Sequence, residues 1–223
     1  GVNLITGDTA AEVLRDSKGS VIGVKLRSGK VIEGEIVVVA IGVVPNAAVI
    51  EGTKVKKEKG ILVDEHLKTS VKDVYAAGDC IETFDVLRKT RRPQPIWPNA
   101  YEQGRAAGLN MAGERISYPG SFGMNSLEIK GLPTITVGMF EAVGPKYEIL
   151  KKIDPAKMTY KKVVLENDRI VGAVFIGDID RAGIVTGLIK DRVNIKAFKH
   201  DLLGDNFGYA MFPMSLRQER YNK

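Results

Sequence analysis

Gly78 and Asp79 are the residues of this sequence whose types and order best suit the binding of a ligand. They directly follow the apolar run Val74–Ala77, which the pattern predicts to be a buried strand. In doubly wound sheets, ligands bind outside the carboxyl ends of the strands. There, Gly78 would let the backbone approach a ligand, and Asp79 would accept hydrogen bonds from its hydroxyl groups. A strand that ends in a tight turn explains the same residues, so the pattern alone leaves both interpretations open.

A helix is predicted to begin at Pro98 and to end at Ala112. Proline suits a first helical position, and the free N–H groups at a helix start favour a nearby negative charge. Ala100, Gly104 and Gly108 lie four residues apart, so with Ala112 they form a face with almost no side-chain bulk. Because glycine inside a helix costs about 1 kcal/mol relative to alanine, we expect this face to pack closely against a sheet or a flat ligand.

Cys80 is the only cysteine, so no disulfide can form within the chain. An isolated thiol beside a buried strand is more often structural than reactive. No catalytic residue and no metal site is predicted from the sequence.

The first fifty residues alternate short apolar segments with turns, which predicts a β-rich meander. Expected strands are Val2–Thr6, Ala11–Arg15 and Val21–Leu26. The run Ile36–Ile41 is apolar on both faces, as is typical of a central strand in a parallel sheet. Gly60–Val63 is expected to be a further strand before the segment that contains Asp79.

After a linker around residues 117–123, strand patterns come first and helical patterns follow, which favours an α+β module. The expected strands are Ser126–Ile129, Pro133–Val137, Tyr147–Lys151, Thr159–Leu165 and Ile170–Ile176, and the expected helices are Arg181–Lys190 and Lys196–Leu203.

The composition is that of a soluble globular protein, with 44% hydrophobic and 27% charged residues. No apolar run approaches the roughly 20 residues that cross a bilayer, and no secretory signal is visible, so no membrane partner is expected and the setting is predicted to be cytoplasmic. The net charge is +6, with basic clusters at residues 54–59 and 88–92. No aromatic residues interleave with them as a stacking platform requires, so nucleic acid is not an expected partner. A solvated surface that steers an anionic ligand is the preferred interpretation.

The segment Thr69–Asp79 resembles the second flavin fingerprint of the pyridine-nucleotide-dependent flavoprotein reductases. Ile41–Asn46 is similar to the segment in which that family's chain returns from the NAD(P)H domain to the FAD domain. The likeness continues through Glu102–Gly108. Tyr160–Val164 and Ile170–Asp178 look most like the carboxyl-terminal domain of NADH:rubredoxin reductases and nitrite-reductase flavin subunits, with NADH oxidases close behind.

The resemblance implies the cofactors FAD and NAD(P)H, with Asp79 bonding the ribityl chain of FAD beside Gly78. It also implies that the helix near Pro98 points its amino end at the flavin pyrimidine ring, which would place Trp97, Asn99 and Ala100 nearest to it. A domain-packing role for Trp97 remains an open alternative. The family's redox cysteines lie in a segment that this sequence does not contain. Glutathione-reductase-type enzymes carry a paired His and Glu near the carboxyl end, and this sequence lacks that motif at His200.

The family's phosphate-binding fingerprint G-x-G-x-x-G is absent, because no two of the 24 glycines are two positions apart. We therefore expect the carboxyl-terminal part of such a flavoprotein, inactive alone, cut or processed before Gly1. It would need an amino-terminal FAD/NAD(P)H half from the same gene or another chain, and would tend to form homo-oligomers. An alternative is a non-catalytic interaction subunit whose carboxyl-terminal module binds a partner.

The expected fold class is α/β: partial FAD/NAD(P)-binding doubly wound domains followed by an α+β carboxyl-terminal domain. The expected divisions are residues 1–52 for the end of the NAD(P)H domain, 53–113 for the returning FAD segment and 114–223 for the carboxyl-terminal interface domain. The electron acceptor, which could be oxygen or a rubredoxin-like protein, and the choice between NADH and NADPH are not predicted.

Overall fold

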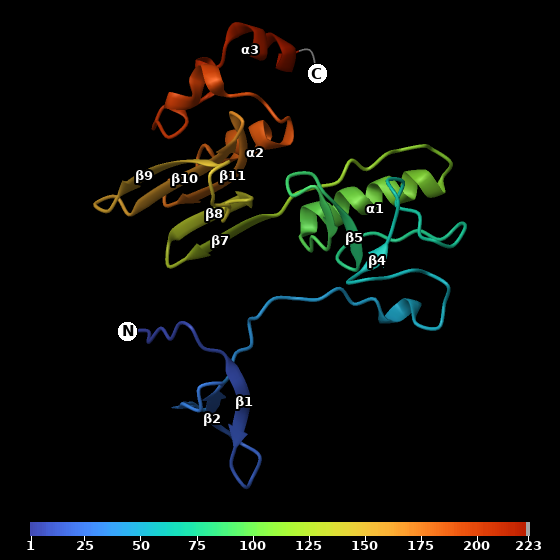
Figure 1. Ribbon diagram of the computed structural model, residues 1–223, viewed down its shortest axis with the longest axis vertical. Helices are drawn as coiled ribbons and strands as arrows, with labels where there is room; N and C mark the ends of the chain where they lie inside the picture. The colour runs from blue at the N-terminus through green and yellow to red at the C-terminus, as the bar shows by residue number, and fades with distance from the viewer. Residues whose placement is uncertain (222–223) are drawn as a thin grey trace. The chain divides into compact units, whose positions relative to one another are not determined.

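A computed structural model describes residues 1–221 of the chain. It contains two compact units, residues 1–43 and 44–223 (Figure 1). Each unit is described by itself below.

The first unit contains a small antiparallel sheet whose strands follow one another in the order β1-β2-β3. The strands are β1 (Ala10–Arg15), β2 (Val21–Leu26) and β3 (Val31–Glu33). The turn between β1 and β2 is held by Asp16, whose Oδ1 accepts hydrogen bonds from the N–H groups of Lys18 and Ser20 at 2.8 and 2.9 Å. Gly19 completes this turn with a φ of +85°, a conformation that glycine adopts without strain.

Two expected strands of this unit, Val2–Thr6 and Ile36–Ile41, are wrong. Both segments are irregular and exposed, with Val38 83% exposed and Ile41 93% exposed. A parallel strand needs a neighbour to accept and donate its backbone hydrogen bonds. Within residues 1–43, no further strand pairs with either segment. An apolar run favours a buried strand, but it does not show which neighbouring strand would pair with it.

The second unit begins with elements that surround one long helix. They are the 3₁₀ turn η1 (Ala48–Ile50), β4 (Ile61–Leu62), β5 (Ile81–Asp85), β6 (Thr90–Arg92) and the helix α1 (Trp97–Met111). β4 pairs with β5 in parallel, with Ile61 opposite Ile81, and β6 adds to β5 in antiparallel orientation. Their small core joins Ile61, Leu67 and Ile81 to Ala106 and Ala107 of α1.

The predicted strand Val74–Ala77 is also wrong. Tyr75 makes a single antiparallel bridge to Lys68, and the extended strand comes after Gly78 and Asp79, as β5, rather than before them. Among the described residues, no strand lies beside Val74–Ala77 to extend this bridge into a ladder.

The helix α1 confirms the predicted helix almost to the residue, but its orientation differs from the expectation. Gly104 and Gly108 are exposed, and a methyl group added at either would meet nothing within 4 Å. The buried face carries Asn99, Gln103 and Asn110, together with two alanines. In the described chain the glycine face therefore does not pack against a sheet, and the other half of the expectation, a flat ligand on this face, stays a prediction.

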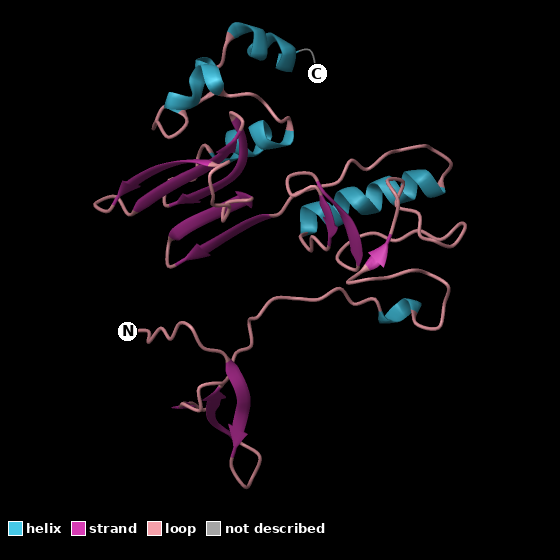
Figure 2. Ribbon diagram, in the orientation of Figure 1, coloured by secondary structure: helices cyan, strands magenta, loops and turns pink. Residues whose placement is uncertain are grey.

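The carboxyl-terminal module is the α+β arrangement that the sequence predicts, with a sheet followed by helices (Figure 2). Its five antiparallel strands lie in the order β7-β8-β11-β10-β9. The strands are β7 (Met124–Ile129), β8 (Leu132–Gly138), β9 (Glu148–Asp154), β10 (Thr159–Glu166) and β11 (Arg169–Ile176). The helical elements are α2 (Ala182–Lys190), η2 (Lys196–Asp201), η3 (Tyr209–Met211) and α3 (Met214–Tyr221), of which η2 is a 3₁₀ helix where the sequence predicted a longer α-helix.

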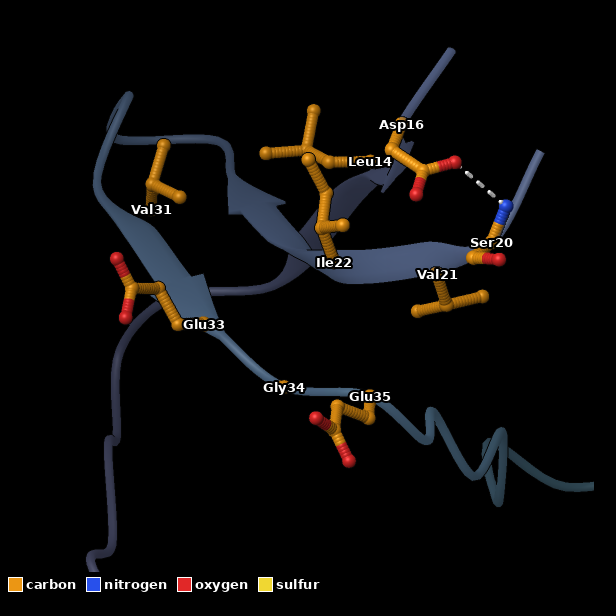
Figure 3. A pocket seen from close by; sticks show the side chains of 9 residues that line it. All are labelled: Leu14, Asp16, Ser20, Val21, Ile22, Val31, Glu33, Gly34 and Glu35. Atoms are coloured by element: carbon orange, nitrogen blue, oxygen red, sulfur yellow. Dashed lines mark hydrogen bonds between the residues drawn. The ribbon is translucent and has the colours of Figure 1, made fainter. Parts of the chain in front are cut away.

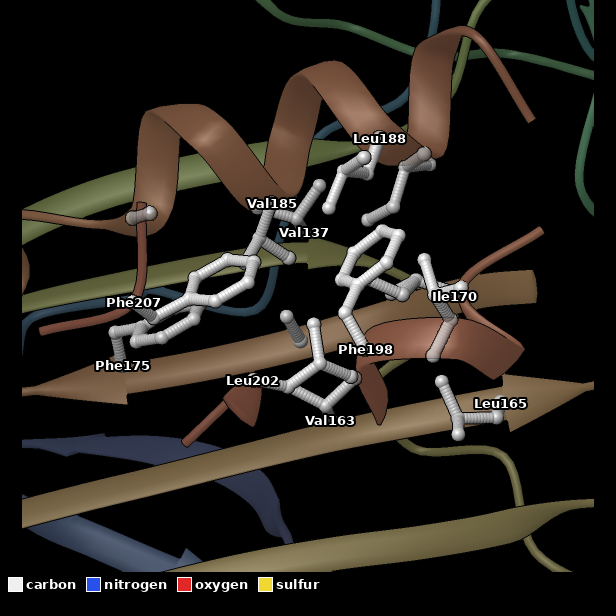
Figure 4. Packing of buried hydrophobic residues seen from close by; sticks show 14 of the residues in the cluster. Val137, Val163, Leu165, Ile170, Phe175, Val185, Leu188, Phe198, Leu202 and Phe207 are labelled. Atoms are coloured by element: carbon white, nitrogen blue, oxygen red, sulfur yellow. The ribbon is translucent and has the colours of Figure 1, made fainter. Parts of the chain in front are cut away.

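The module closes a core of its own between the sheet and the helical elements (Figure 4). Val163 of β10 lies opposite Ala173 of β11, which lies opposite Val137 of β8, so one row of buried side chains crosses the sheet. Val185 and Leu188 of α2 pack onto this row. Three rings extend the core into the last segment: Phe198, Phe207 and Phe212, with the Phe198 and Phe212 centroids 4.8 Å apart.

Within residues 1–221, no helix is long and apolar enough to span a bilayer. The same residues contain no group of three or more His, Cys, Asp or Glu side chains arranged to hold a metal ion.

Candidate functional site

Gly78 and Asp79 form a turn that leads directly into β5. Gly78 has a φ of +89°, in the left-handed region that side chains strain to adopt. Its carbonyl oxygen accepts a hydrogen bond from the Ile81 N–H at 3.2 Å, which closes the turn. Glycine is therefore required here by backbone conformation, before any ligand is considered.

This turn lies against the first two turns of α1. A methyl group at Gly78 would stand 3.7 Å from the Cβ of Ala100. One turn further along the helix, the Oε1 of Gln103 accepts a hydrogen bond from the Gly78 N–H at 2.8 Å. The structure thus brings together the turn and the start of the helix, although they are about twenty residues apart in the sequence.

The start of α1 is open to a negative charge. Ile96 precedes it in an extended conformation, and a proline stands in its first turn. No side chain caps this end, and the first turn contains no acidic residue. The first N–H groups of a helix have no intrahelical acceptor and carry the positive end of its dipole, so they attract an anion or an electron-rich ring edge.

Asp79 presents an unpaired carboxylate beside this helix start. Its side chain is exposed and makes no hydrogen bond or ion pair with any described residue. An ionised carboxylate only accepts hydrogen bonds, so it suits hydroxyl donors. The neighbouring turn positions the backbone from which this side chain extends.

The other three predicted site residues differ from one another in environment. Ala100 contacts the Gly78 turn, as described above. Trp97 is 85% exposed and belongs to neither hydrophobic core. Asn99 is buried, its Nδ2 donates to the Gln94 carbonyl at 3.3 Å, and its backbone N–H belongs to the first turn of the helix.

The sequence analysis gave no role to the buried amides of α1. Asn99, Gln103 and Asn110 each bond a loop: Asn99 the Gln94 segment, Gln103 the Gly78 turn, and Asn110 the backbone of His66 and Ile116. Their spacing of four and seven residues is the signal that could have revealed one common face. Buried amides at such a spacing indicate a helix that holds loops in place.

Cys80 adjoins this site without the features of a redox thiol. Burial is the main cause that raises the pKa of its thiol, and the negative charge of Asp79 raises it further. The thiolate is the reactive form of cysteine, so this environment lowers the reactivity of Cys80 near neutral pH. The structural role expected from the sequence remains a prediction.

A hollow of about 680 Å³ in the first unit has a different character (Figure 3). Apolar side chains of the three strands line it together with Asp16, Glu33 and Glu35. Its charged side chains are all acidic, so it would repel the phosphates of a nucleotide. The chemistry suited to an anionic cofactor lies at the Gly78 turn and α1 instead.

Comparison with known proteins places these features in a family. The family model described as pyridine nucleotide-disulphide oxidoreductase matches residues 1–104, which include the Gly78–Asp79 turn. A second model, described as the rubredoxin NAD+ reductase C-terminal domain, matches residues 124–193 of the module. The chain belongs to the pyridine nucleotide-disulphide oxidoreductase family. The description of this family names a pyridine nucleotide, in line with the NAD(P)H that the sequence resemblance implied.

Two curated relatives illustrate the similarity. The NADH-rubredoxin oxidoreductase of Clostridium acetobutylicum is 34% identical over 151 residues, 68% of this chain and 38% of that protein. The nitrite reductase [NAD(P)H] of Bacillus subtilis strain 168 is 28% identical over 196 residues, 87% of this chain and 23% of that protein. The chain therefore spans well under half the length of these relatives.

Solved structures show the same fold. The NAD-dependent persulfide reductase from A. fulgidus aligns over the whole chain and 45% of its own length, with a TM-score of 0.77 and 23% identity. The NADH:rubredoxin oxidoreductase structure from Clostridium acetobutylicum aligns over 75% of this chain and 42% of its own, with a TM-score of 0.59 and 28% identity. The predicted fold class, α/β followed by α+β, is confirmed by these likenesses together with the strand and helix order.

Proposed function

We propose that this chain supplies part of the FAD site of an NAD(P)H-dependent flavoprotein oxidoreductase. The observation that carries the proposal is the unpaired Asp79 carboxylate, on a turn whose Gly78 lies against Ala100 at the open start of α1. The cofactor-binding residues we propose are Gly78, Asp79, Trp97, Asn99 and Ala100.

These residues fit one portion of FAD. The Asp79 carboxylate would accept hydrogen bonds from the hydroxyl groups of the ribityl chain. The N–H groups and dipole at the start of α1, through Trp97 and Asn99, would stabilise negative charge on the ring system. When bound, FAD would take up a hydride from NAD(P)H and release electrons singly or in pairs. The residues of this chain would orient it and balance its charge.

The rest of the cofactor would be held by an amino-terminal half of the protein, from the same gene or from another chain. The sequence contains no G-x-G-x-x-G turn for a pyrophosphate. Ile36, Val38 and Ile41 are exposed here, and a sheet completed by that half would bury such side chains. In this proposal residues 1–52 end the NAD(P)H domain, 53–113 return to the FAD domain and 114–223 form an interface domain, which suits a homo-oligomer.

We further propose that the electrons pass to a small redox protein of the rubredoxin type, with oxygen as the alternative acceptor. Support comes from the module, which matches the rubredoxin reductase C-terminal domain, and from the 34% identical relative named NADH-rubredoxin oxidoreductase. The net charge of +6 suits an acidic protein partner because opposite charges speed encounter.

Reconstitution tests this function. The 223-residue chain alone is expected to purify without stoichiometric FAD and to leave NADH unoxidised. Together with the amino-terminal half, it should retain FAD and reduce rubredoxin or oxygen with NADH. A yellow preparation of the chain alone that oxidises NADH would contradict the proposed division. A complete protein that binds no flavin would instead favour a non-catalytic interaction subunit.

Asp79→Asn, introduced into the complete protein, tests the residue itself. Loss of a charge-assisted hydrogen bond is worth about 1.5–3 kcal/mol, so FAD affinity should fall by roughly tenfold to a hundredfold. Asp73→Asn is the matched control, because Asp73 is an exposed carboxylate six residues earlier and asparagine tolerates its φ of +62°. Equal FAD affinity in the two variants, measured by flavin fluorescence titration, would remove Asp79 from the site.

A further inference from the structure

Gln103 is the buried side chain that ties α1 to the Gly78 turn. Only 2% of its surface is exposed. Its Oε1 accepts the Gly78 N–H at 2.8 Å, and its Nε2 donates to the hydroxyl of Tyr118 at 3.4 Å. Both ends of the amide are therefore used, one on the turn and the other on the segment that follows α1.

The hydrogen bond to Gly78 matters because Gly78 adopts a left-handed backbone conformation that shapes the turn before Asp79. A buried amide costs free energy unless it is hydrogen-bonded, so Gln103 is retained only where its two ends find partners. The same bond supplies the acceptor for the N–H of Gly78, whose φ of +89° is one of several conformations open to glycine. Without that acceptor the turn could relax into others.

The direction of the Asp79 side chain depends on this conformation. Asp79 follows Gly78 directly, and no described residue bonds its carboxylate. The backbone of the turn therefore sets the direction in which the Asp79 side chain leaves the chain, and no side-chain contact adds to it. A helix-borne acceptor is a more rigid support for that backbone than a loop would be.

We propose that Gln103 is a positioning residue for the cofactor: it fixes the Gly78 turn so that the Asp79 carboxylate stands ready for the hydroxyl groups of the ribityl chain. This assignment rests on the proposed function. Gln103 does not touch the cofactor itself, and it acts only through the turn.

Asn110 offers an internal control on the same helix face. It is buried, and its amide bonds the carbonyl oxygens of His66 and Ile116 and the Ile116 N–H, all at 2.8 to 2.9 Å. It makes no bond to the Gly78 turn. Removing either amide should loosen the helix–loop packing, but only the loss of Gln103 should reach Asp79.

The test compares three variants of the complete protein: Gln103→Met, Gln103→Glu and Asn110→Leu. Methionine matches the length of glutamine without an acceptor, and glutamate keeps an acceptor for Gly78 while the Tyr118 hydroxyl can donate in its turn. We expect Gln103→Met to weaken FAD binding about tenfold, Gln103→Glu to restore most of the affinity, and Asn110→Leu to bind FAD as the wild type does. Thermal unfolding should show that the Met and Leu variants are both destabilised.

Wild-type affinity in Gln103→Met would overturn the assignment, and so would an equal loss in Gln103→Met and Asn110→Leu, which would indicate general loosening. If Gln103→Glu fails to fold, the difference in FAD affinity between Gln103→Met and Asn110→Leu still tests the assignment. If the wild-type complete protein binds no FAD, the proposed function and this assignment are both overturned. If the wild type binds FAD and Gln103→Met binds it equally tightly, only the assignment is overturned.

Discussion

The carboxyl-terminal module and the first forty-three residues are both rich in apolar strand patterns, but the module buries most of these side chains and the first unit leaves most of them exposed. In the module, Phe175, Phe207 and Leu165 are all at most 1% exposed. In the first unit, Ile36 is 84% and Ile41 93% exposed. The module contains both layers of its core, a sheet and the helices that cover it, whereas residues 1–43 contain a sheet without a second layer. An apolar pattern becomes a core only where the same chain brings the opposing layer.

The largest expected effect on stability comes from truncating a buried side chain of the module, compared with an exposed one of the first unit. Phe175→Ala should lower the free energy of unfolding of the chain by about 3–5 kcal/mol, because it removes a ring from a closed core. Ile41→Ala should leave it within about 0.5 kcal/mol, because the side chain is already in water. Urea denaturation followed by circular dichroism measures both.

In the complete protein the two substitutions should have more similar effects. There Ile41→Ala should cost about 2–5 kcal/mol, since the amino-terminal half would bury the side chain. If Ile41→Ala is already that costly in the 223-residue chain, the first unit has a covered core and the contrast fails.

Glycines give the next expected effect. A methyl group at Gly172 of β11 would lie 2.4 Å from the Met139 and Phe140 backbone, so Gly172→Ala should destabilise the chain by about 1–3 kcal/mol. At Gly104 of α1 a methyl group meets nothing within 4 Å, so Gly104→Ala should stabilise the chain by up to about 1 kcal/mol.

Thermal melts of the two alanine variants, run side by side, measure this difference. Destabilisation by Gly104→Ala in the isolated chain would show that the glycine face of α1 is already covered there. A loss that appears only in the complete protein would instead place that face against the amino-terminal half.

Local sequence patterns predicted the positions of many strands and helices, but not which segments pair with or cover one another. The apolar, β-branched strand patterns in residues 159–165 and 170–176 predicted β10 and β11 to within a residue, because turn residues bound both segments and neighbouring strands of the same module pair with them. The run Ile36–Ile41 misled, because an apolar sequence does not say which segment will cover it. Val74–Ala77 misled for the same reason.

At the candidate site, the sequence singled out Gly78, Asp79 and Ala100 but not the hydrogen bond from the Gly78 N–H to Gln103, which ties the turn to the helix. Gly78 and Ala100 lie together as the two motifs suggested, while their roles toward FAD remain predictions. The sequence interpretation of this helix rested on its glycine face and gave no role to Gln103. A polar residue in a helix is normally assigned to solvent, and only its three-dimensional partners reveal that it is buried.

The smallest expected effect concerns Cys80, which follows Asp79 and packs against the small core beside α1. Burial and the Asp79 charge raise the pKa of its thiol, so the thiolate fraction at neutral pH is lower in the folded chain than in the unfolded one. The rate of alkylation by iodoacetamide should therefore rise with pH through a higher midpoint in the native chain than in urea. The pH midpoints of alkylation are compared rather than its rates, because burial slows the reaction at every pH. Asp79→Asn removes the charge and should lower the native midpoint part of the way, leaving the part caused by burial. Identical midpoints in native and unfolded chains would mean that neither burial nor the Asp79 charge raises the pKa of the Cys80 thiol.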